Sequence, residues 1–406
     1  MSAHRPASGF ADFPDYVRLR KRLEQVRKLG VELPFGRLSE SVAHSTITIG
    51  GRDYLNFSNY DYLDLSAHPA VVQAAKDAID RYGTSVSASR LVSGERPIHR
   101  ELERQIADLL GAQDCLVFVS GYLTNLTTVG HLYGPRDLVA HDASVHNSAV
   151  HGCMHARARR LIFPHNDWEA LDRMLAENSS RNGRTLIIIE GLYSMDGDYP
   201  DLPRFLEVKR RHNADLMIDE AHSLGVMGAR GHGIREHFGV AGEDVDIWMG
   251  TLSKTLASCG GYIAGSRELI EYLRLSAPGF VYSVGIPPAS AAAAMASLRV
   301  LIAEPWRVET LRARGRLFLE CARARGLDTG LSQGFNIVPV ITGSSLAAVK
   351  LSNSLFDEGI GVYPIVAPAV EERTARLRFF LSCAHTEDQI RRTVDLAALH
   401  WDRLRV

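Results

Sequence analysis

Three chemically capable side chains, Asp219, His222 and Lys254, follow two short apolar runs of the kind that form buried strands. Parallel strands bring the residues beyond their carboxyl ends to one edge of a sheet, so these side chains are expected to lie together. A lysine amine forms an imine with an aldehyde, and a carboxylate keeps a pyridine nitrogen protonated so that the ring accepts electrons. These are the groups that hold pyridoxal phosphate, and the sequence therefore predicts that cofactor.

Lys254 is the residue on which this prediction depends. A lysine after a buried strand is usually ordinary, but Thr251 stands three residues before this one, and Asp219 and His222 follow another predicted strand. A desolvated lysine beside cationic or phosphate groups has a lowered pKa and becomes nucleophilic. We therefore expect Lys254 to be the catalytic lysine.

Two further segments follow predicted strands. Ser120-Gly121-Tyr122 comes after the run 116–119 and opens a predicted helix, whose free N–H groups would bind phosphate with help from the hydroxyls of Thr251 and Ser253. His146 lies beyond the run 137–140, where an imidazole could stack on a cofactor ring.

Other chemistries fit these segments less well. The string Asp-Glu-Ala-His at 219–222 also occurs in ATP-dependent helicases, but these need a GxxxxGK[ST] loop, which the chain lacks. The acids of segment 193–198 do not have the spacing of a calcium loop, so we interpret this segment as a structural turn beside the cofactor. We expect no metal site.

The elements that must position these residues alternate along the chain. Apolar runs predict strands at 116–119, 137–140, 185–189, 216–218, 246–249 and 262–264, with helical stretches between them. Runs such as 186–189 are apolar throughout, which is typical of a mostly parallel sheet covered by helices on both faces. The predicted fold class is therefore α/β.

The length of 406 residues favours more than one domain. A helix is predicted at 16–29, with Leu19, Leu23 and Val26 on one face, and an alanine-rich buried helix follows Gly285-Ile-Pro-Pro288. Further strands are expected at 335–341 and 377–381. We predict an N-terminal helix and arm at 1–52, a large cofactor-binding domain at 53–285 and a small α+β domain at 286–406.

Composition narrows the possible partners. The net charge of -1 gives no electrostatic reason to expect a nucleic acid or a membrane surface. The five cysteines are an odd number without a CxxC pair, which indicates reduced thiols. The first residues contain no apolar signal core, and no apolar run is long enough to span a bilayer. We expect a cytoplasmic protein.

Taken together, the chain resembles the α-oxoamine synthase family of fold-type I pyridoxal-phosphate enzymes from about Asn56 to His385. The matching residues and segments are Tyr62-Leu63, Ser93-Gly94, His99, Leu102-Glu103, 120–122, 142–146, 165–167, 190–191, 194–198, 219–222, 251–254, Tyr282-Ser283, Pro287-Pro288 and 376–378.

The resemblance implies a role for each candidate residue. Lys254 would carry the imine and move the α-proton, Asp219 would pair with the pyridine nitrogen, and Arg378 would bind the amino-acid carboxylate through its planar fork. His222 would reach the phenolic oxygen and His146 would stack on the ring. The remaining cofactor contacts implied are Ser120, Gly121, Tyr122, Glu190, Ser194, Thr251, Ser253 and Ser283.

The reaction implied is a decarboxylating Claisen condensation. The deprotonated amino acid attacks an acyl thioester, a thiol and carbon dioxide leave, and an α-amino ketone forms. Family members are homodimers with the site at the subunit interface, so a homodimer is expected.

Departures from the family pattern bear on the substrates. Tyr60 replaces a common Asn, as in serine palmitoyltransferases, and could bind the substrate carboxylate; Asp64 replaces a glycine. Ser283-Val-Gly285 keeps one hydroxyl of a phosphate contact from the partner subunit. Val366-Ala-Pro-Ala369 replaces an Arg-Pro-Pro-Thr segment of the oxononanoate synthase, which argues against a short acid-terminated acyl donor.

The substrate predictions follow from these departures. Val284, Val366 and Ala369 make the acyl side apolar, so a long chain on coenzyme A or a carrier protein is expected. Ser89 stands where glycine-specific members tend to carry Thr, which leaves room for a side chain and favours L-alanine, then L-serine, then glycine.

Two alternatives remain open. One is another fold-type I reaction, such as that of an aminotransferase or aldolase. The other is a non-catalytic subunit of a heterodimer, which the presence of Lys254 disfavours because such subunits lack the lysine.

Overall fold

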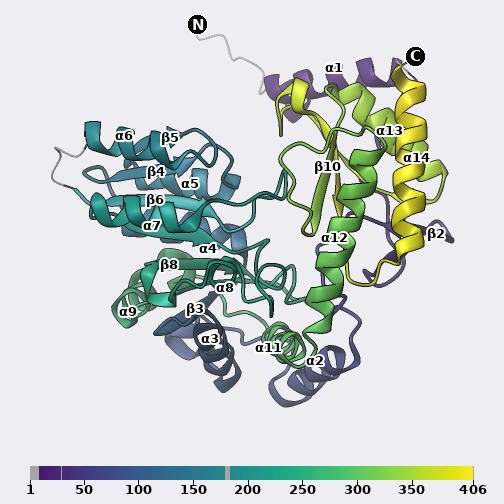
Figure 1. Ribbon diagram of the computed structural model, residues 1–406. Coiled ribbons are helices and arrows are strands. Elements are labelled where there is room, and N and C mark those ends of the chain that lie inside the picture. Colours follow the sequence, from purple (N-terminus) through teal and green to yellow (C-terminus); the bar gives the residue numbers. More distant parts are fainter. Residues whose placement is uncertain (1–8, 29, 179–182, 406) are drawn as a thin grey trace, which may run out of the picture.

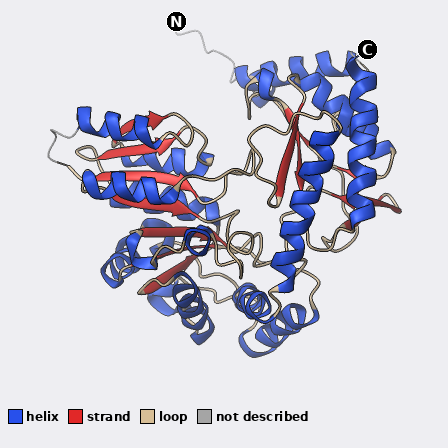
Figure 2. Cartoon of the chain, in the orientation of Figure 1, coloured by secondary structure: helices blue, strands red, loops and turns tan. Residues whose placement is uncertain are grey.

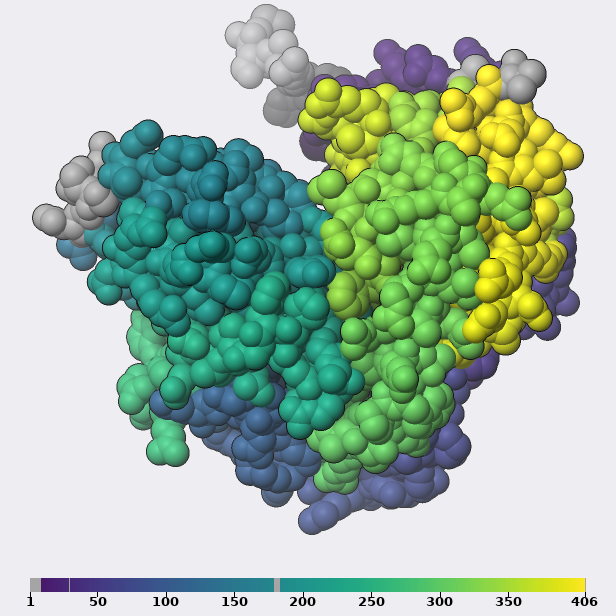
Figure 3. Space-filling view, in the orientation of Figure 1, coloured from purple at the N-terminus to yellow at the C-terminus, as the bar shows by residue number. Residues whose placement is uncertain are grey.

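The computed structural model describes residues 9–28, 30–178 and 183–405, which form two lobes (Figure 1). The sheet lobe runs from helix α3 (Pro97–Leu110) to helix α10 (Pro278–Val281). The C-terminal lobe runs from helix α12 (Trp306–Ala324) to helix α14 (Glu387–Arg405), and the N-terminal helix α1 (Pro14–Lys28) lies against it. Figure 3 shows that the teal atoms of the sheet lobe adjoin the green atoms of the C-terminal lobe.

The sheet lobe is organised around seven strands. They are β3 (Asp114–Phe118), β4 (Leu138–Asp142), β5 (Arg159–Phe163), β6 (Thr185–Glu190), β7 (Asp215–Asp219), β8 (Ile247–Thr251) and β9 (Gly261–Gly265), in the order β3-β9-β8-β7-β6-β4-β5. The strands from β8 to β5 are parallel, whereas β9 is antiparallel to both β3 and β8. The predicted α/β fold with a mostly parallel sheet is confirmed, and the parallel strands all end at one edge.

Helices cover both faces of this sheet (Figure 2). Besides α3 and α10 they include α4 (Gly121–Leu132), α5 (Asn147–Ala156), α6 (Trp168–Asn178), α7 (Leu202–Arg211), α8 (Ile234–Phe238) and α9 (Arg267–Ser276). Along β6, Ile187 and Ile189 belong to one hydrophobic cluster, and Leu186 and Ile188 to the cluster on the opposite face. Burial on both faces explains why this strand is apolar without alternation.

The C-terminal lobe contains two three-stranded sheets. Strands β10 (Ile337–Ile341), β13 (Arg376–Phe380) and β12 (Pro364–Ile365) form one, and β1 (Thr46–Ile49), β2 (Arg52–Asn56) and β11 (Ile360–Gly361) form the other. Helix α13 (Ser345–Asp357) contacts β11, β12 and β13. The parallel pairing of β2 with β11 joins the start of the chain to this lobe.

The alanine-rich helix is α11 (Pro288–Ala303), which packs against α2 (Pro69–Tyr82) and α3. Small side chains such as Ala291 and Ala294 are fully buried, so the predicted buried helix is confirmed. The division at 52 and 285 stays a prediction.

Helix α1 forms where a helix was expected, but its apolar face is only partly covered in one chain. No residue of α1 is buried, and Leu19 is about half exposed. Its predicted last residue, position 29, lies outside the described residues.

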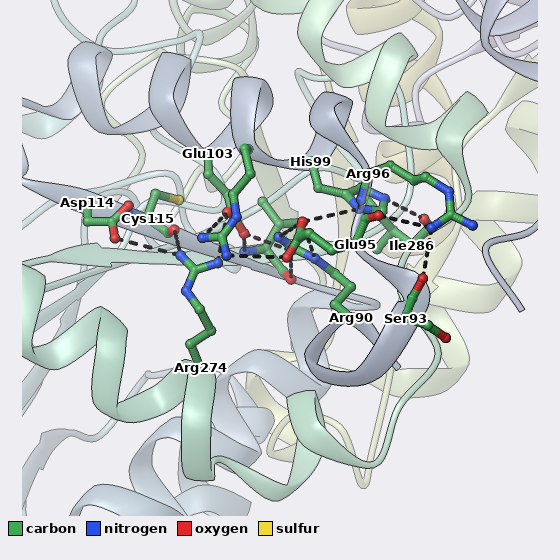
Figure 4. A network of polar contacts seen from close by, with 12 residues as sticks. Arg90, Ser93, Glu95, Arg96, His99, Glu103, Asp114, Cys115, Arg274 and Ile286 are labelled. Atoms are coloured by element: carbon green, nitrogen blue, oxygen red, sulfur yellow. Dashed lines mark hydrogen bonds and ion pairs between the residues drawn. The ribbon is translucent and has the colours of Figure 1, made fainter. Parts of the chain in front are cut away.

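A buried charge network ties β3 to the segment before it (Figure 4). Arg90 Nη1 donates to Glu103 Oε1 at 2.7 Å and to the Val117 carbonyl at 3.2 Å, and its Nη2 donates to Glu95 at 2.8 Å. Glu103 also accepts from the Val117 N–H at 2.9 Å and from Arg274 at 3.3 Å. Because the two arginines and the two carboxylates compensate one another, the network can remain ionised away from water. It fixes the strand that leads into the segment 120–122.

Candidate active site

A cavity of about 430 Å³ lies beyond the carboxyl ends of the parallel strands. It collects most of the residues predicted to hold the cofactor or substrate, which come from strand ends far apart in the sequence. Those lining it are Tyr60, Ser120, Gly121, Tyr122, His146, Glu190, Ser194, Asp219, His222, Thr251, Ser253, Lys254 and Arg378.

Lys254 follows β8, and its amine faces this cavity. Burial lowers the pKa of Lys254 below its usual range, and the positive charge of Arg378 acts in the same direction. The carboxylates of Asp219 and Glu190 oppose the shift without cancelling it. The lysine is thus biased toward the neutral amine, the form that attacks a carbonyl carbon.

Asp219 ends the neighbouring strand β7 and is held by two hydrogen bonds. Asn125 Nδ2 donates to Asp219 Oδ2 at 2.9 Å, and the Ala221 N–H donates to Oδ1 at 2.9 Å. Asn125 also donates to Ser148 Oγ at 2.9 Å, so it bridges α4 to α5. Sequence reasoning missed Asn125, although it lies four residues after Gly121 and therefore on the same helix face.

His222 is a buried imidazole whose Nδ1 lies 2.8 Å from the Tyr62 hydroxyl. Burial lowers the pKa of His222 well below its usual range, and the charges of Lys254 and Arg378 add to the shift. Burial also raises the pKa of Tyr62, so its hydroxyl keeps its proton. We assign Tyr62 as the donor to Nδ1, which leaves Nε2 of the neutral imidazole as the N–H group.

His146 lies at the N-terminus of α5. Its Nδ1 lies 2.7 Å from Ser148 Oγ, and its backbone N–H donates to Glu190 Oε1 at 2.5 Å. Burial lowers the pKa of His146 and raises that of Glu190 well above its usual range; the nearby Asp219 raises the latter further. The lowered pKa favours the neutral form of the His146 ring.

Gly121 begins α4, which is capped by Ser120. Ser120 Oγ accepts from the Leu123 N–H at 3.1 Å, and the first N–H groups of the helix have no acceptor inside it. A Cβ on Gly121 would lie 3.0 Å from Thr251 Oγ1, so a larger residue would crowd the turn against β8. Thr251 Oγ1 donates to the Gly260 carbonyl at 3.0 Å and lies 2.8 Å from Ser253 Oγ.

The donor set of this cavity fits pyridoxal phosphate. The helix N-terminus and the adjoining hydroxyls suit a dianionic phosphate, the carboxylate of Asp219 suits a protonated ring nitrogen, and Lys254 suits an aldehyde.

Arg378 and Tyr60 line the side of the cavity next to the C-terminal lobe. Arg378 Nη1 donates to the Ser194 carbonyl at 2.8 Å, and its Cζ lies 4.6 Å from the Phe380 ring centre. The Tyr60 ring centre lies 5.7 Å from Lys254 Nζ. These two side chains are therefore placed to meet a substrate bound near the lysine.

Ser89 and Ser283 do not line this cavity in a single chain. Ser89 Oγ donates to the Val281 carbonyl at 2.6 Å, and Ser89 forms an isolated antiparallel bridge with Val284. Ser283 lines a separate small cavity beside Arg90. Their roles remain predictions.

Residue His165 links three loops behind the cavity. Its Nδ1 lies 2.8 Å from Asp142 Oδ1 and its Nε2 lies 2.8 Å from Asp198 Oδ2. Burial alone would lower the pKa of His165, but the hydrogen bonds and charges of the two carboxylates raise it to about 10. His165 thus forms ion pairs with the carboxylates of Asp142 and Asp198.

The ion pairing of His165 predicts a specific pH dependence of the free energy of unfolding. The folded pKa of about 10 exceeds the usual unfolded value of about 6.5, so the folded state binds the extra proton between these pH values. The stabilisation is complete below about pH 6.5 and is lost as the pH rises through about 10. His165→Asn should flatten the fall in the free energy of unfolding between about pH 7 and 9.5, measured by denaturant titration. An unchanged slope would contradict the ion pairing of His165.

Comparison with known proteins shows the family of this chain. The family Aminotransferase class I and II matches residues 52–396. The 8-amino-7-oxononanoate synthase of Geobacter sulfurreducens is 38% identical over 374 residues, covering 92% of this chain and 95% of that one. The enzyme of the same name from Methylococcus capsulatus is 40% identical over 354 residues, covering 87% and 91%.

Among solved structures, a serine palmitoyltransferase from S. paucimobilis with bound PLP–myriocin superposes with a TM-score of 0.92 at 28% identity. It covers 98% of this chain and 99% of its own. The chain belongs to the α-oxoamine synthase family.

This α-oxoamine synthase is a pyridoxal-phosphate-dependent C-acyltransferase that condenses an amino acid with an acyl thioester and releases carbon dioxide. Among its described helices, none is long and apolar enough to cross a membrane.

One departure from the family pattern is accommodated by the backbone. Asp64 replaces a glycine and has a φ of 57°, in the left-handed region that glycine favours. Aspartate is among the few other residues that enter this region, and here its carboxylate contacts His44.

Proposed function

We propose that this α-oxoamine synthase condenses L-alanine with a long, apolar acyl thioester, releasing an α-amino ketone, carbon dioxide and free thiol. L-Serine and glycine rank after L-alanine, and coenzyme A or an acyl carrier protein carries the acyl chain. The observation that carries the proposal is the convergence of Lys254, Asp219 and Arg378 on one cavity. An amine, a carboxylate and a guanidinium there can serve the cofactor and the amino-acid carboxylate together.

Each side chain has a task in this proposal. Arg378 pairs with the carboxylate of the amino acid, and Lys254 takes the proton from its α-carbon. The lowered pKa of Lys254 supports the second task, because a base with a pKa closer to neutral both accepts and returns a proton readily. Tyr60 offers its hydroxyl to the same carboxylate.

The other residues of the cavity hold the cofactor. When bound, pyridoxal phosphate supplies an aldehyde carbon and a protonated ring that accepts electrons from the α-carbon. Asp219 would hold the pyridine nitrogen, His222 the phenolic oxygen and His146 the ring face. Ser120, Gly121, Tyr122, Thr251 and Ser253 would hold the phosphate, and Glu190 and Ser194 would lie beside the ring.

Support for alanine comes from the relatives. By its name, 8-amino-7-oxononanoate ends in a methyl carbon and an amino carbon, the two-carbon unit that alanine leaves after losing its carboxylate, and the adjoining ketone carbon is the one an acyl thioester supplies. The serine palmitoyltransferase likeness supports L-serine as the second choice. Ser89 adds little, since its hydroxyl is bonded to Val281 and the residue does not line the cavity.

Support for an apolar acyl chain comes from this chain's own residues. Val284 is about half exposed, and Val366 and Ala369 are partly or fully exposed in a segment without a basic side chain. A nonanoate product carries a carboxylate at its far end, which a basic residue would recognise. The replacement of arginine by Val366 removes that option here.

A homodimer with a shared site is part of the proposal. Tyr282 and Val284, which flank Ser283, are 85% and 51% exposed in a single chain. A second copy covering this segment would bury both side chains and bring Ser283 toward the partner's phosphate. The five free cysteines support a reducing, cytoplasmic location.

The test is a substrate panel with thiol release as the readout. L-Alanine, L-serine and glycine are each combined with dodecanoyl-CoA and with heptanedioyl-CoA, the acid-terminated chain that would give a nonanoate. We expect kcat/KM to be highest for L-alanine with dodecanoyl-CoA. Its kcat/KM should exceed that of L-alanine with heptanedioyl-CoA by about tenfold or more, since two buried methylenes contribute about 1.6 kcal/mol.

Each outcome has a distinct meaning. Preference for heptanedioyl-CoA would overturn the acyl assignment while leaving the reaction intact. Formation of a keto acid without thiol release would instead indicate an aminotransferase.

A further inference from the structure

One face of β13 points toward the sheet lobe. Alternate residues of a strand share a face, so Arg376, Arg378 and Phe380 lie on one side, whereas Leu377 and Phe379 are fully buried on the other. The side that carries the arginines therefore faces the boundary between the lobes.

These three side chains contact successive parts of the sheet lobe. The Phe380 ring centre lies 6.3 Å from that of His222, at the cavity. Arg378 donates to the Ser194 carbonyl at 2.8 Å, and Arg376 Nη1 lies 2.9 Å from Asp196 Oδ2. Both arginines thus bind the turn 194–197, which follows β6.

The turn fits closely against the C-terminal lobe. Gly197 has a φ of 73°, and a Cβ there would lie 2.3 Å from the Ile337 carbonyl oxygen. The Gln333 N–H donates to the Gly197 carbonyl at 3.3 Å. The position of the turn therefore depends on contacts across the lobe boundary.

The pair Arg376–Asp196 has little exposure to solvent. The side chain of Arg376 is 8% exposed and that of Asp196 is 19% exposed. Arg376 Nε also donates to the Thr374 carbonyl at 2.8 Å, and its Nη1 donates to the Met195 carbonyl at 3.3 Å. A charge pair held by several bonds away from water is stronger than an exposed one.

Arg378 is left with one free edge. Its Nη1 is taken by Ser194, whereas its buried Nε has no hydrogen-bond partner among the residues described. The edge of a guanidinium formed by Nε and Nη2 meets a carboxylate with two parallel hydrogen bonds. The contact with Ser194 thus leaves that edge of Arg378, which lines the cavity, available to a carboxylate.

We propose that Arg376 and Asp196 are positioning residues, whose ion pair fixes the turn that holds Arg378 ready for the amino-acid carboxylate. The proposal rests on the function assigned to Arg378 above. In this proposal Arg376 holds the turn 194–197 in place, and Arg378 binds the carboxylate of the amino acid.

Four variants test the pair: Arg376→Met, Asp196→Asn, the double variant, and Arg376→Lys, which keeps the charge. Binding of L-alanine and of L-alaninamide, which lacks the carboxylate, is followed by the change in cofactor absorbance, alongside KM and kcat. Each single loss should weaken L-alanine binding and raise its KM about tenfold while kcat stays within about twofold. Alaninamide binding should not change, the double variant should be no worse than the worse single one, and Arg376→Lys should recover most of the loss.

Arg373→Met is the matched control, because Arg373 pairs with Glu371 on the surface, where both side chains are mostly exposed. It should behave as the unaltered enzyme. Denaturant unfolding of the cofactor-free variants gives a second cycle, in which Arg376→Met and Asp196→Asn should again be non-additive.

Three results would overturn the proposal: unchanged L-alanine binding in both single variants, an equal loss for alaninamide, or fully additive effects. Arg378→Met separates this failure from that of the proposed function. If Arg378→Met does not weaken the binding of L-alanine more than that of alaninamide, the assignment of Arg378 is wrong. If it does and the pair variants do not, only the positioning proposal fails.

Discussion

Replacing Lys254 by Ala is expected to lower turnover by about 10⁴-fold or more and to remove the visible absorbance of the lysine-bound cofactor. Lys254 lines the cavity together with Asp219 and Arg378. Burial lowers the pKa of Lys254, which favours the neutral, nucleophilic amine. Alanine removes both the covalent attachment and the base that moves the α-proton. Steady-state thiol release and the absorbance spectrum measure the two losses separately.

Two controls accompany this variant. Lys254→Arg keeps a positive charge but cannot form the imine, so it should be as inactive as the alanine variant. Lys350→Ala removes an exposed lysine on α13 and should leave both readouts unchanged. Turnover within about tenfold of normal in Lys254→Ala would refute the central assignment of the site.

The second large effect is expected at Asp219→Asn. The substitution keeps the shape of the side chain but removes the charge that would face the protonated ring nitrogen. Loss of one partner from a buried charge pair costs about 3–5 kcal/mol, so kcat should fall by about 10² to 10⁴-fold. The KM for L-alanine should change little, because the substitution leaves Arg378, the residue proposed to bind the carboxylate, intact.

Asp215→Asn provides the matched control for this variant. Asp215 begins the same strand and accepts a hydrogen bond from the Tyr133 hydroxyl at 2.8 Å, far from the strand's carboxyl end. It should leave kcat unchanged. A kcat for Asp219→Asn close to that of this control would exclude the role proposed for Asp219.

The strands that position the site could be predicted because their sequences are constrained on both faces. The strands β6, β7 and β8 are buried throughout, so their apolar runs stand out from the flanking polar residues. Where an apolar run stops, the strand ends, and Asp219 and Thr251 mark two of those points. The prediction that the site residues lie close together was based on these strand ends alone.

Edge and interlobe elements could not be predicted in the same way. Strand β5 lies at the edge of the sheet, begins with two exposed arginines and has no continuous apolar run. Strands β1, β2 and β11 are short, and their pairing joins residues from opposite ends of the chain. Local sequence patterns contain no information about such distant partners.

The cavity contains residues that sequence reasoning did not select. Asn125, Ser148, Met195, Ala221 and Met249 also line it. Asn125 lies inside a helix, where a polar side chain at a buried position was the available signal. Met195 and Met249 are apolar, and their presence in the cavity follows from how the strand ends and loops meet rather than from their own chemistry.

The pairing of β2 with β11 has a consequence for how the protein folds during its synthesis. Leu55 pairs with Ile360, so the N-terminal strand emerges from the ribosome long before its partner exists. At about 5–20 residues per second, roughly 15–60 s pass between them. The intervening sheet lobe can fold in that interval, whereas the edge of β2 that faces away from β1 has no partner strand until β11 is made. Completion of the C-terminal lobe is therefore expected to be the late, slow step of synthesis-coupled folding, because closing so long a loop follows the docking of everything between.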